Sequence, residues 1–482
     1  MVELTVTSFL LVQGLTSVFW GAFADAIGRR PIYLIALVLY LTANVALSYS
    51  PNFTVLMLFR GVQSGGSAST LILGSGVIQD ISPPSERGTF TSFYLSIRNF
   101  SIAVGPVLGG ALAQNLGFRS IFIFLSIGTA VLLVAVTLYL PETLRAIAGN
   151  GSLRLSGVYQ PWMRRFKEPG YTRDPGPKAA NRLTSRTVLA PLMLLFEKDI
   201  FSGLLFSGLA YTSWGLLTAT TTPMFEKTFR LSETLIGLCF LPNGLGTIVG
   251  SVLVGSLMTT DYKAVQASYN AAHDRPRDSE LSPSMNLPAD FPLERARLRH
   301  IPWVTAVFVA SLGLYGLAMD AKRLPWKLAS RPGWIAVPLL LQFLIAASSN
   351  GIITIYQTLI SDLCPGQGAG STAISSLVSR LLNAAGVSFV EPLLEAWGPA
   401  YLYLGLAGVG AVYVALAAAS WYLGPGWRRQ RLAKLGLKEE EDERKEGEKK
   451  KEKEKKVEMT KTLVLLSSVV ASRGFTTDLE KN

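Results

Sequence analysis

The chain has 482 residues, of which 49% are hydrophobic and only 16% are charged, and this composition excludes an ordinary soluble protein of that length. Its formal net charge of +12 does not indicate nucleic-acid binding, because the basic residues are spread along the chain and form no single patch. The two cysteines and two histidines fall where they predict no disulfide, no metal site and no histidine relay. We expect no enzymatic activity and no cofactor.

Apolar runs recur along the chain at lengths that suit membrane-spanning helices, which need about 20 apolar residues each. Five runs precede a long polar segment and six follow it. They are residues 4–24, 32–50, 53–78, 91–113, 118–140, 199–222, 232–258, 302–319, 334–359, 369–390 and 399–423. One such run would also suit a buried helix of a soluble protein, but eleven in series predict an all-α, multi-pass membrane protein.

The runs and the polar segments between them divide the chain into parts. We expect an incomplete N-terminal helical bundle (1–141), a cytoplasmic central linker (142–197), a C-terminal helical bundle (198–423) with a cytoplasmic insertion (262–300), and a charged cytoplasmic tail (424–482). Pro, Gly and Arg are frequent in the linker, which is typical of a segment that need not fold alone. The tail alternates Lys and Glu, which favours a solvated segment over one that binds anionic lipid or a partner.

The first two runs are separated by the pattern Gly21-Ala-Phe-Ala-Asp25-Ala-Ile-Gly28-Arg29-Arg30. Short loops rich in Lys and Arg stay cytoplasmic, so Arg29 and Arg30 orient the helices. With this orientation, 34 of the 45 Lys and Arg residues fall inside. We expect Gly21 to allow close helix packing and Asp25 to pair with a basic group or a helix end. The alternative is a solubilising turn.

The third run contains an arginine, in the pattern Leu58-Phe-Arg60-Gly61-Val-Gln63-Ser64. An arginine within the bilayer is costly unless it faces a partner or water, so Arg60 should face the interior of the protein. It is either a functional group or half of a buried ion pair. Gln63, Ser64 and Ser67 extend its polar face at helical spacing.

The fourth run contains Gly105-Pro106-Val-Leu-Gly109-Gly110. Proline removes one backbone hydrogen bond and the glycines allow bending and close packing. The pattern predicts a hinge or a tight helix contact, and a plain packing motif is the alternative.

These three patterns resemble the inside-loop, fourth-helix and fifth-helix signatures of the major facilitator superfamily, and the last is typical of drug:proton antiporters. Further patterns resemble fungal twelve-helix drug:proton antiporters of the quinidine-resistance type. They are Leu140-Pro141-Glu142-Thr143, Gly237-Leu-Cys-Phe-Leu-Pro242-Asn243-Gly244 and Pro365-Gly366-Gln367-Gly368. The resemblance implies the major facilitator fold, in which two pseudo-symmetric helical bundles enclose a central cavity and alternate their opening. With this chain, about 11 transmembrane helices (5+6) are expected.

Two departures from the family pattern stand out. Thr5 to Phe23 aligns with the family's second helix, so we expect the first family helix, which contributes to the cavity, to be absent. In the second half, Thr259 and Thr260 replace an Asp-Arg pair that is usual in the family, and this weakens the second inside-loop signature.

Polar stripes at helical spacing mark three runs that should line the cavity, although such stripes also serve as hydrogen-bonding contacts between helices. The stripes are Tyr211, Trp214, Thr218 and Thr222; Asn350, Thr354, Gln357 and Ser361; and Thr372, Ser376, Arg380 and Asn383. Aromatic and amide groups suit amphipathic or cationic organic substrates. Arg60, Arg98 and Arg380 argue instead for anionic groups.

Proton coupling needs a carboxylate or histidine that titrates within the pathway, and the sequence places none in the middle of a run. The coupling carboxylate is therefore expected on the missing helix, or Asp80 or Glu391 serves.

The sequence favours a secondary transporter that exports drugs or small organic metabolites against proton entry, acting as a monomer in the plasma or vacuolar membrane. A non-transporting sensor or receptor on the same fold and an inactive truncated transporter are the alternatives. An ATP-driven pump is disfavoured because the chain has no Gly-x-x-x-x-Gly-Lys-Ser/Thr loop.

Overall fold

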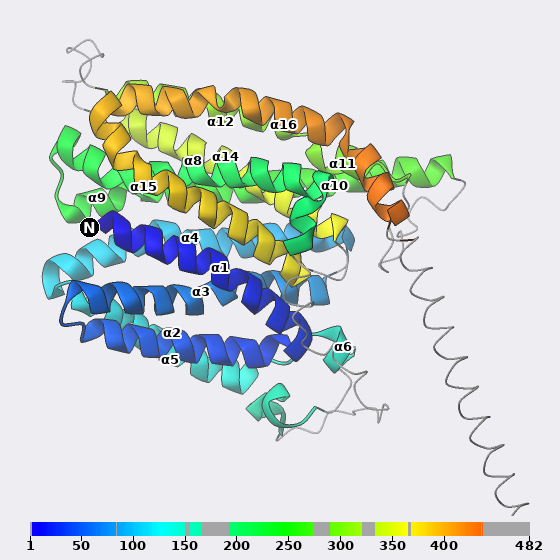
Figure 1. The fold of residues 1–482 in the computed structure, drawn as a ribbon, viewed down its shortest axis with the longest axis horizontal. Helices are drawn as coiled ribbons and strands as arrows, with labels where there is room; N and C mark the ends of the chain where they lie inside the picture. Colours follow the sequence, from blue (N-terminus) through cyan, green and yellow to red (C-terminus); the bar gives the residue numbers. More distant parts are fainter. Residues whose placement is uncertain are drawn as a thin grey trace, which may run out of the picture. The chain divides into compact units, whose positions relative to one another are not determined.

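The computed structural model describes residues 2–82, 84–149, 155–165, 192–273, 290–320, 333–364, 368–434 and 436. Within these ranges the chain is helical and contains no strand. The chain divides into two compact units, residues 1–425 and residues 426–482, and the named helices all belong to the first. Figure 1 shows these helices lying side by side.

The first half of the larger unit contains five long helices. They are α1 (Val2–Ile27), α2 (Arg29–Ser48), α3 (Phe53–Ile81), α4 (Pro84–Leu116) and α5 (Arg119–Tyr139). Three short elements follow, α6 (Arg145–Ala148), η1 (Gly157–Tyr159) and η2 (Trp162–Arg165). The start of α3 is set by Asn52, whose Oδ1 accepts a hydrogen bond from the Val55 N–H at 2.9 Å.

The second half is built from longer and more interrupted helices. They are η3 (Leu194–Phe196), α8 (Lys198–Phe229), α9 (Glu233–Cys239), α10 (Leu241–Ala272), α11 (Leu293–Leu298), α12 (Ile301–Met319), α14 (Ala336–Leu363), α15 (Gly368–Gly408) and α16 (Gly410–Tyr422). The helix α15 changes direction at Gly398, where φ is 77° and Pro399 follows. Glycine tolerates this positive φ, and proline restarts the helix.

Nine of the eleven apolar runs each coincide with one of these helices, the run 232–258 extends over α9 and α10, and the last run extends over the end of α15 together with α16. Eight segments of the described chain are long and apolar enough to cross a membrane, one of them extending over both α15 and α16. The helices α3 and α4 contain more glycine and polar residues, and they pack among the other long helices.

The two halves repeat one packing arrangement. In the first half α1 and α2 both pack on α3, and α2 packs on α5; in the second half α10 and α12 both pack on α14, and α12 packs on the end of α15. The halves contact each other mainly through α1 along α15 and α4 along α10. The helix α8 packs on α14 and α15, and none of the described helices holds the matching place in the first half. These relations define the major facilitator fold with its two pseudo-symmetric bundles.

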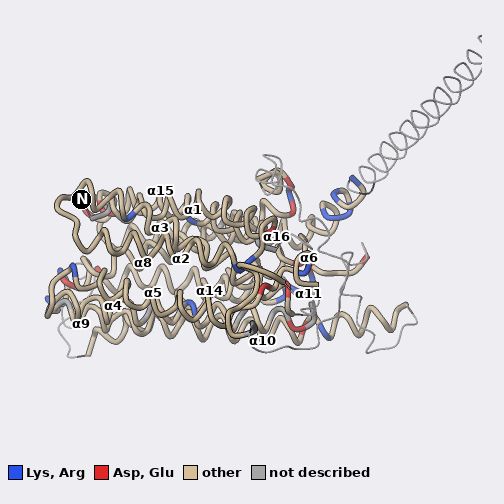
Figure 2. The backbone as a smooth tube through the Cα atoms, turned by 90° about the horizontal axis from the view of Figure 1, so that it is seen from below, with Lys and Arg blue, Asp and Glu red and all other residues tan. Residues whose placement is uncertain are grey.

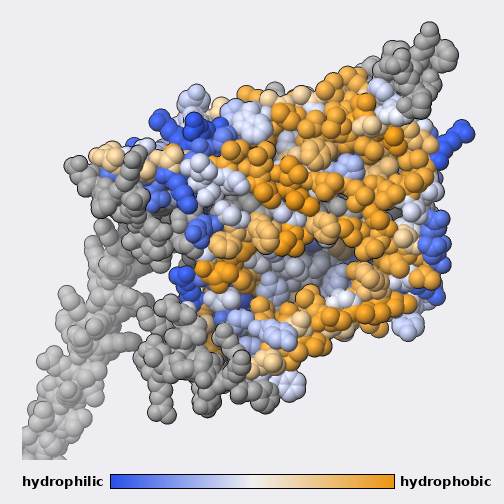
Figure 3. All heavy atoms as spheres, turned by 180° about the vertical axis from the view of Figure 1, so that it is seen from behind, coloured by the Kyte–Doolittle hydropathy of each residue, from blue (hydrophilic) through white to orange (hydrophobic). Residues whose placement is uncertain are grey.

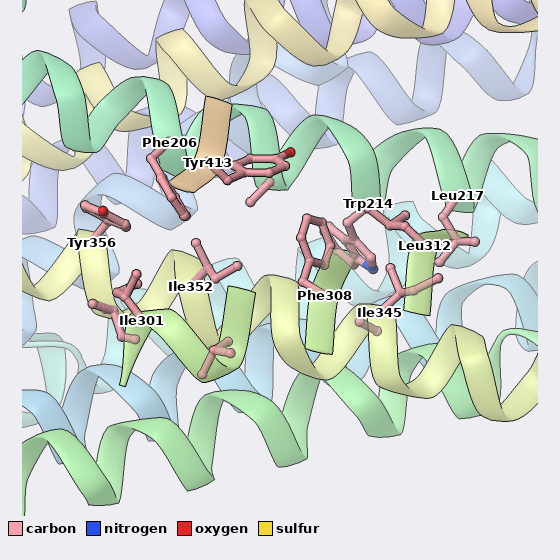
Figure 4. Packing of buried hydrophobic residues seen from close by; sticks show 14 of the residues in the cluster. Phe206, Trp214, Leu217, Ile301, Phe308, Leu312, Ile345, Ile352, Tyr356 and Tyr413 are labelled. Carbon is pink, nitrogen blue, oxygen red and sulfur yellow. The ribbon is translucent and has the colours of Figure 1, made fainter. Parts of the chain in front are cut away.

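The largest hydrophobic core lies in the second half (Figure 4). Phe206 of α8 packs against Tyr356 and Tyr413, with ring centroids 4.8 and 5.2 Å apart, and Phe308 of α12 packs against Tyr413 at 5.8 Å. Aromatic pairs at these distances stabilise the packing beyond the area that they bury. This core packs α8, α12, α14 and α16 together as one rigid part of the second half.

On the face of the molecule shown in Figure 3, the outward side chains of the helices are largely apolar. On α5, for example, the exposed side chains include Ile123, Phe124, Ile127, Val131 and Val134. An apolar surface of this extent fits lipid and not water. Figure 3 also shows a hollow in the first half, whose floor is paler, and so less hydrophobic, than the surface around it.

The structure corrects two expected boundaries. The stretch between the first two runs is helical almost throughout, because α1 continues to Ile27 and α2 begins at Arg29. Gly28 alone separates them, with φ at 117°. The helix α10 continues to Ala272, so the first residues of the segment 262–300 extend a helix, and α11 forms near its end.

Candidate transport pathway and gate

The turn between α1 and α2 depends on Gly28 and on a distant carboxylate. Glu142, which is buried, accepts hydrogen bonds from the backbone N–H groups of Arg29 (2.9 Å) and Arg30 (3.1 Å). The first N–H groups of a helix have no partner within the helix itself, and a negative charge is favourable there. A Cβ on Gly28 would lie 2.7 Å from Oε2 of Glu142, so only glycine fits. The Leu140-Pro141-Glu142-Thr143 pattern therefore caps α2.

The Arg29 side chain links three helices. Its Nη1 donates to Oδ1 of Asp25 on α1 at 2.6 Å, and its Nε donates to Oδ2 of Asp80 on α3 at 3.1 Å. The Arg29 side chain is 4% exposed, against 28% for Asp25 and 13% for Asp80. Removing one partner of a buried ion pair leaves an uncompensated charge, which is costly. This cluster lies at the end of the bundle predicted to be cytoplasmic, here called the inside end.

Arg30 and Gly21 complete the inside-loop pattern. Arg30 donates to the Thr137 carbonyl oxygen of α5 at 2.7 Å and to the carbonyl oxygen of Val158. It therefore fastens the turn to α5 and η1. Gly21 is buried in α1, one turn before Asp25. The five residues Gly21, Asp25, Gly28, Arg29 and Arg30 thus lie together, and the two arginines contact different partners.

Arg60 lies in the first half among α2, α3 and α5. Its Nη1 donates to Oε1 of Gln63 at 3.1 Å, and its guanidinium lies 5.3 Å from the ring centroid of Phe122. Gln63 in turn donates to Oδ1 of Asn44 at 2.7 Å. Among the described residues no carboxylate lies within 4.0 Å of Arg60, so the interpretation as half of a buried ion pair has no support there.

Two arginines from opposite halves, Arg98 of α4 and Arg380 of α15, interact electrostatically. Arg380 of α15 donates to the hydroxyl of Tyr211 on α8, and its guanidinium lies 4.8 Å from the Tyr211 ring centroid. Arg98 of α4 interacts electrostatically with Arg380 and with the phenol groups of Tyr94 and Tyr211. In the described chain neither arginine has a carboxylate within 4.0 Å. A positively charged site therefore lies between the halves. Figure 2 shows how few Lys and Arg residues lie along the middle of the helices.

The polar residues around Tyr211 form the rest of this site. Trp214, whose ring centroid is 5.6 Å from that of Tyr211, donates from Nε1 to Oδ1 of Asn243 on α10 at 2.9 Å. Asn383, one turn after Arg380, lies against Gly215, where an added Cβ would come within 2.2 Å of its Oδ1. The structure thus brings Tyr211, Trp214, Arg380 and Asn383 together.

The remaining predicted cavity residues lie on α14 and near the end of α8. Asn350 of α14 is buried and donates to the Ala346 carbonyl oxygen on its own helix at 3.0 Å. Gln357 lies two turns later on α14 and is partly buried. Thr222 is exposed. The cavity-facing role of Asn350 and Gln357 stays a prediction.

The Gly105-Pro106-Val-Leu-Gly109-Gly110 pattern lies on α4, which continues through Pro106. A Cβ added at Gly105 or Gly109 would meet no atom within 4 Å, so these glycines make no close helix contact here. The close approach is made by Gly237 of α9, where a Cβ would lie 3.0 Å from the Pro106 carbonyl oxygen. Gly110 is partly buried. The hinge role stays a prediction.

Three residues beside this candidate site were not among the predicted site residues. Gly14 of α1 brings that helix onto α15, because a Cβ on Gly14 would lie 3.1 Å from Cβ of Arg380. Tyr94 of α4 donates to the Thr70 carbonyl oxygen at 2.9 Å and faces Arg98. Asn243 is the only amide residue of the 232–258 run, and that signal would have identified it.

Hydrogen bonds join the two halves near both ends of the helices. At the inside end they are Gln79 Nε2 to Ser361 Oγ (2.6 Å) and Thr89 Oγ1 with Thr259 Oγ1 (3.3 Å). At the opposite end they are Thr7 Oγ1 with Ser388 Oγ (3.2 Å) and Thr234 Oγ1 to Gln114 Oε1. The positively charged site therefore lies between two sets of contacts that hold the halves together.

The repeated bundles and the inside-loop turn are the features by which the chain can be placed in a family. A family model described as Major Facilitator Superfamily matches residues 1–267, more than half of the chain. The chain belongs to the major facilitator superfamily. It is accordingly a multi-pass membrane protein of a family of transporters, and not of a family of enzymes.

Relatives within the superfamily include transporters from fungi. Citrate exporter 1 of Aspergillus niger is 40% identical over 437 residues, which cover 90% of this chain and 81% of that protein. Quinidine resistance protein 1 of Saccharomyces cerevisiae is 29% identical over 410 residues, which cover 82% and 71%. The crystal structure of the human organic anion transporter MFSD10 matches with a TM-score of 0.57 and 17% identity, covering 86% and 83%. That structure supports the major facilitator fold.

Replacing Asp25 by Asn should slow transport more than it weakens substrate binding. The change removes one of the two carboxylates on Arg29, at the inside end and not at the positively charged site. We expect maximal turnover to fall by about tenfold, the ratio that corresponds to 1.4 kcal/mol, with little change in KM. Initial rates in reconstituted vesicles over a range of substrate concentrations would measure both. An unchanged turnover rate would remove Asp25 from the conformational cycle.

Proposed function

We propose that this chain is a secondary active transporter that exports small organic metabolites by alternating access against proton entry, and that its substrates are organic anions with two or more carboxylates. The observation that carries the proposal is the electrostatic interaction of Arg98 and Arg380, from opposite halves, without a carboxylate partner in the described chain. The alternating access rests on the two-bundle fold.

The electrostatic argument for an anion is direct. A charged guanidinium away from water is unfavourable until an opposite charge compensates it. Arginine presents several N–H donors in a planar fork that matches a carboxylate. Two such groups on opposite halves suit a substrate with two carboxylates, which would draw the halves together. A cation at the same place would be repelled.

The relatives support this substrate class. A protein named for citrate export is 40% identical along most of both chains. Citrate is a tricarboxylate, and its carboxylates would pair with the guanidinium groups of both arginines. We infer that the present substrate is of the same chemical class.

Drug export is the second candidate. It is favoured by the neighbouring rings of Tyr211 and Trp214, which suit flat organic molecules, and by the likeness to proteins named for quinidine resistance and multidrug transport. Arg380, which lies on the Tyr211 ring, opposes a cationic drug. This candidate therefore requires neutral or anionic drugs.

Proton coupling would involve the inside end. Glu391, one of the two carboxylates that the sequence offered, is exposed, whereas Asp80 is bound by Arg29. Protonation of Asp80 would neutralise one partner of Arg29 and weaken the cluster that holds α1 and α3. We infer that the proton acts on this cluster. A location in the plasma membrane fits export from the cell, with the vacuolar membrane as the alternative, and we expect a monomer.

The test is transport by the full chain in reconstituted vesicles, with radiolabelled citrate and the cationic dye rhodamine 6G as separate probes. We expect citrate transport that responds to a pH gradient and no transport of the dye. Dye transport without citrate transport would replace the anion proposal by drug export. A chain that inserts but moves neither probe, nor a panel of other dicarboxylates and tricarboxylates, would contradict the proposal and favour a sensor or an inactive chain.

A further inference from the structure

An amide side chain near Arg380 has a buried oxygen that accepts no hydrogen bond from the described chain. Asn383 of α15 is 5% exposed, and its Oδ1 has no hydrogen-bond partner among the described residues. Leaving a buried polar atom unpaired is costly, so such an atom in a folded protein needs an explanation. The groups around Asn383 indicate which kind of partner its oxygen would take.

Asn383 lies in the positively charged site, one helical turn from its arginine. Arg380 and Asn383 are three residues apart on α15, so they are neighbours on one face of this helix. On α8, Tyr211 contacts Arg380. Gly215, one turn later on α8, lies against the Asn383 amide. Because three residues of helix rise about 4.5 Å, a small molecule bound to Arg380 lies within one turn of the Asn383 oxygen.

Gly215 makes the room that the Asn383 amide occupies. A Cβ on Gly215 would lie 2.2 Å from Oδ1 of Asn383, and 2.7 Å from both its Cγ and its Nδ2. A side chain at position 215 would therefore displace the amide. The glycine thus allows the polar end of Asn383 to lie between α8 and α15 at the level of the site.

A second amide of the same site has the opposite atom unpaired. Asn243 of α10 is fully buried, and its Oδ1 accepts the hydrogen bond from Trp214 at 2.9 Å. Its Nδ2 donates to no residue that the structure describes. The two guanidinium groups and this Nδ2 are donors that a carboxylate can use. The Asn383 oxygen differs from them, because it can bind only a group that donates.

The partner of the Asn383 oxygen must therefore carry a hydrogen-bond donor. The ionised carboxylates of the proposed substrates supply none, because a carboxylate only accepts hydrogen bonds. An ammonium group would donate, but Arg98 and Arg380 would repel its positive charge. A hydroxyl group donates without any charge, and it can also accept a hydrogen bond.

We propose that Asn383 determines substrate specificity by accepting a hydrogen bond from a substrate hydroxyl, so that the transported anions are hydroxy polycarboxylates. Arg98 and Arg380 bind the carboxylates of such a substrate, and Asn383 distinguishes it from a polycarboxylate without a hydroxyl. An analogue that lacks the hydroxyl leaves the buried oxygen unpaired and is bound less well. The inference rests on the proposed function, because it selects among polycarboxylates.

The experiment compares two tricarboxylates that differ only in a hydroxyl group, which citrate carries and tricarballylate lacks. Initial uptake of each radiolabelled acid is measured over a range of concentrations, with the full chain in reconstituted vesicles. We expect the parent chain to prefer citrate by about 5- to 150-fold in kcat/KM, which is the ratio that one unpaired buried polar group produces.

Variants at two positions test whether Asn383 causes this preference. Asn383→Leu removes the acceptor and should lower citrate uptake to the level of tricarballylate, whose own uptake should not fall. Asn383→Asp keeps an accepting oxygen but adds a negative charge, so both rates should fall while the preference for citrate remains. Gly215→Ala displaces the amide and should reduce the preference as Asn383→Leu does.

Asn115→Leu is the matched control for Asn383→Leu. Asn115 is exposed on α4, and its Nδ2 donates to the Ala111 carbonyl oxygen of its own helix at 2.8 Å. The same chemical change there should leave the uptake of both acids, and the ratio between them, equal to those of the parent chain.

Equal uptake of the two acids by the parent chain would overturn the inference, since water and not the substrate would then bind the Asn383 oxygen, but the export of polycarboxylates would stand. A proportional loss of both acids in Asn383→Leu would also overturn it, because that pattern indicates a structural role. If Asn383→Leu does not insert, the parent chain and Gly215→Ala decide. Uptake of neither acid by the parent chain would contradict the proposed function itself, and the inference with it.

Discussion

Arg380→Gln is expected to lower transport of a tricarboxylate probe strongly while membrane insertion is unchanged. The substitution removes the guanidinium that lies on the Tyr211 ring and faces Arg98 across the two halves. A charge-assisted hydrogen bond contributes about 1.5–3 kcal/mol, so the rate at low substrate should fall by about 10- to 150-fold. Arg380→Lys keeps the charge but loses the planar fork and should recover only part of the rate. Initial uptake of radiolabelled citrate in vesicles measures all three chains.

Lys227→Gln is the matched control for this comparison. It removes a positive charge from the exposed last turn of α8, the helix that carries Tyr211. Its transport should equal that of the parent chain. Arg98→Gln should resemble Arg380→Gln, and the double variant should be little worse than either, because one substrate bridges both groups. Parent-like transport by Arg380→Gln would remove this arginine from the pathway.

Gly28→Ala is expected to destabilise the protein by more than the backbone strain at this position alone. The backbone at Gly28 has φ at 117°, which costs a residue with a Cβ about 1–3 kcal/mol. The added Cβ would also lie 2.7 Å from the buried Glu142 carboxylate, which caps α2. Displacing that carboxylate exposes the N–H groups of Arg29 and Arg30. A thermal unfolding curve of the purified protein in detergent would measure the loss.

Gly117→Ala separates the two causes. Gly117 also has a positive φ, of 81°, but an added Cβ there would meet no atom within 4 Å. It should therefore show only the backbone cost, and Gly28→Ala should be clearly less stable. Equal losses at the two positions would mean that Glu142 moves aside freely and that its cap contributes little.

The helices of this chain could be predicted because each contains a run of apolar residues that is continuous in the sequence. A lipid-facing helix such as α5 is apolar along its whole length, and length alone then identifies it. The turn at Gly28 was also recognised, but its extent was not, because the apolar pattern ends several residues before the helix does. The same cause hid the continuation of α10 to Ala272, whose last turns leave the apolar run.

The candidate site was predictable only as a set of residue types. Arg60, Arg98 and Arg380 each stand out as charges in apolar runs, but the sequence does not say which two approach each other. That depends on α4 meeting the second half, a contact between residues far apart in the chain. Glu142 and Arg297 were missed as partners for the same reason. Glu142 accepts a hydrogen bond from the Arg29 N–H, 113 positions away, and Arg297 donates to Asp362, 65 positions away.

The pair of arginines between the halves also means that the protein without substrate moves charge within the membrane when it changes conformation. Arg98 and Arg380 have no carboxylate within 4.0 Å in the described chain, so their charges travel with the surrounding helices when the halves rock. An elementary charge that crosses a potential of 100 mV changes its energy by about 2.3 kcal/mol. Voltage steps on a membrane rich in this protein should therefore displace a transient capacitive current without any substrate, and a bound polycarboxylate should reduce it.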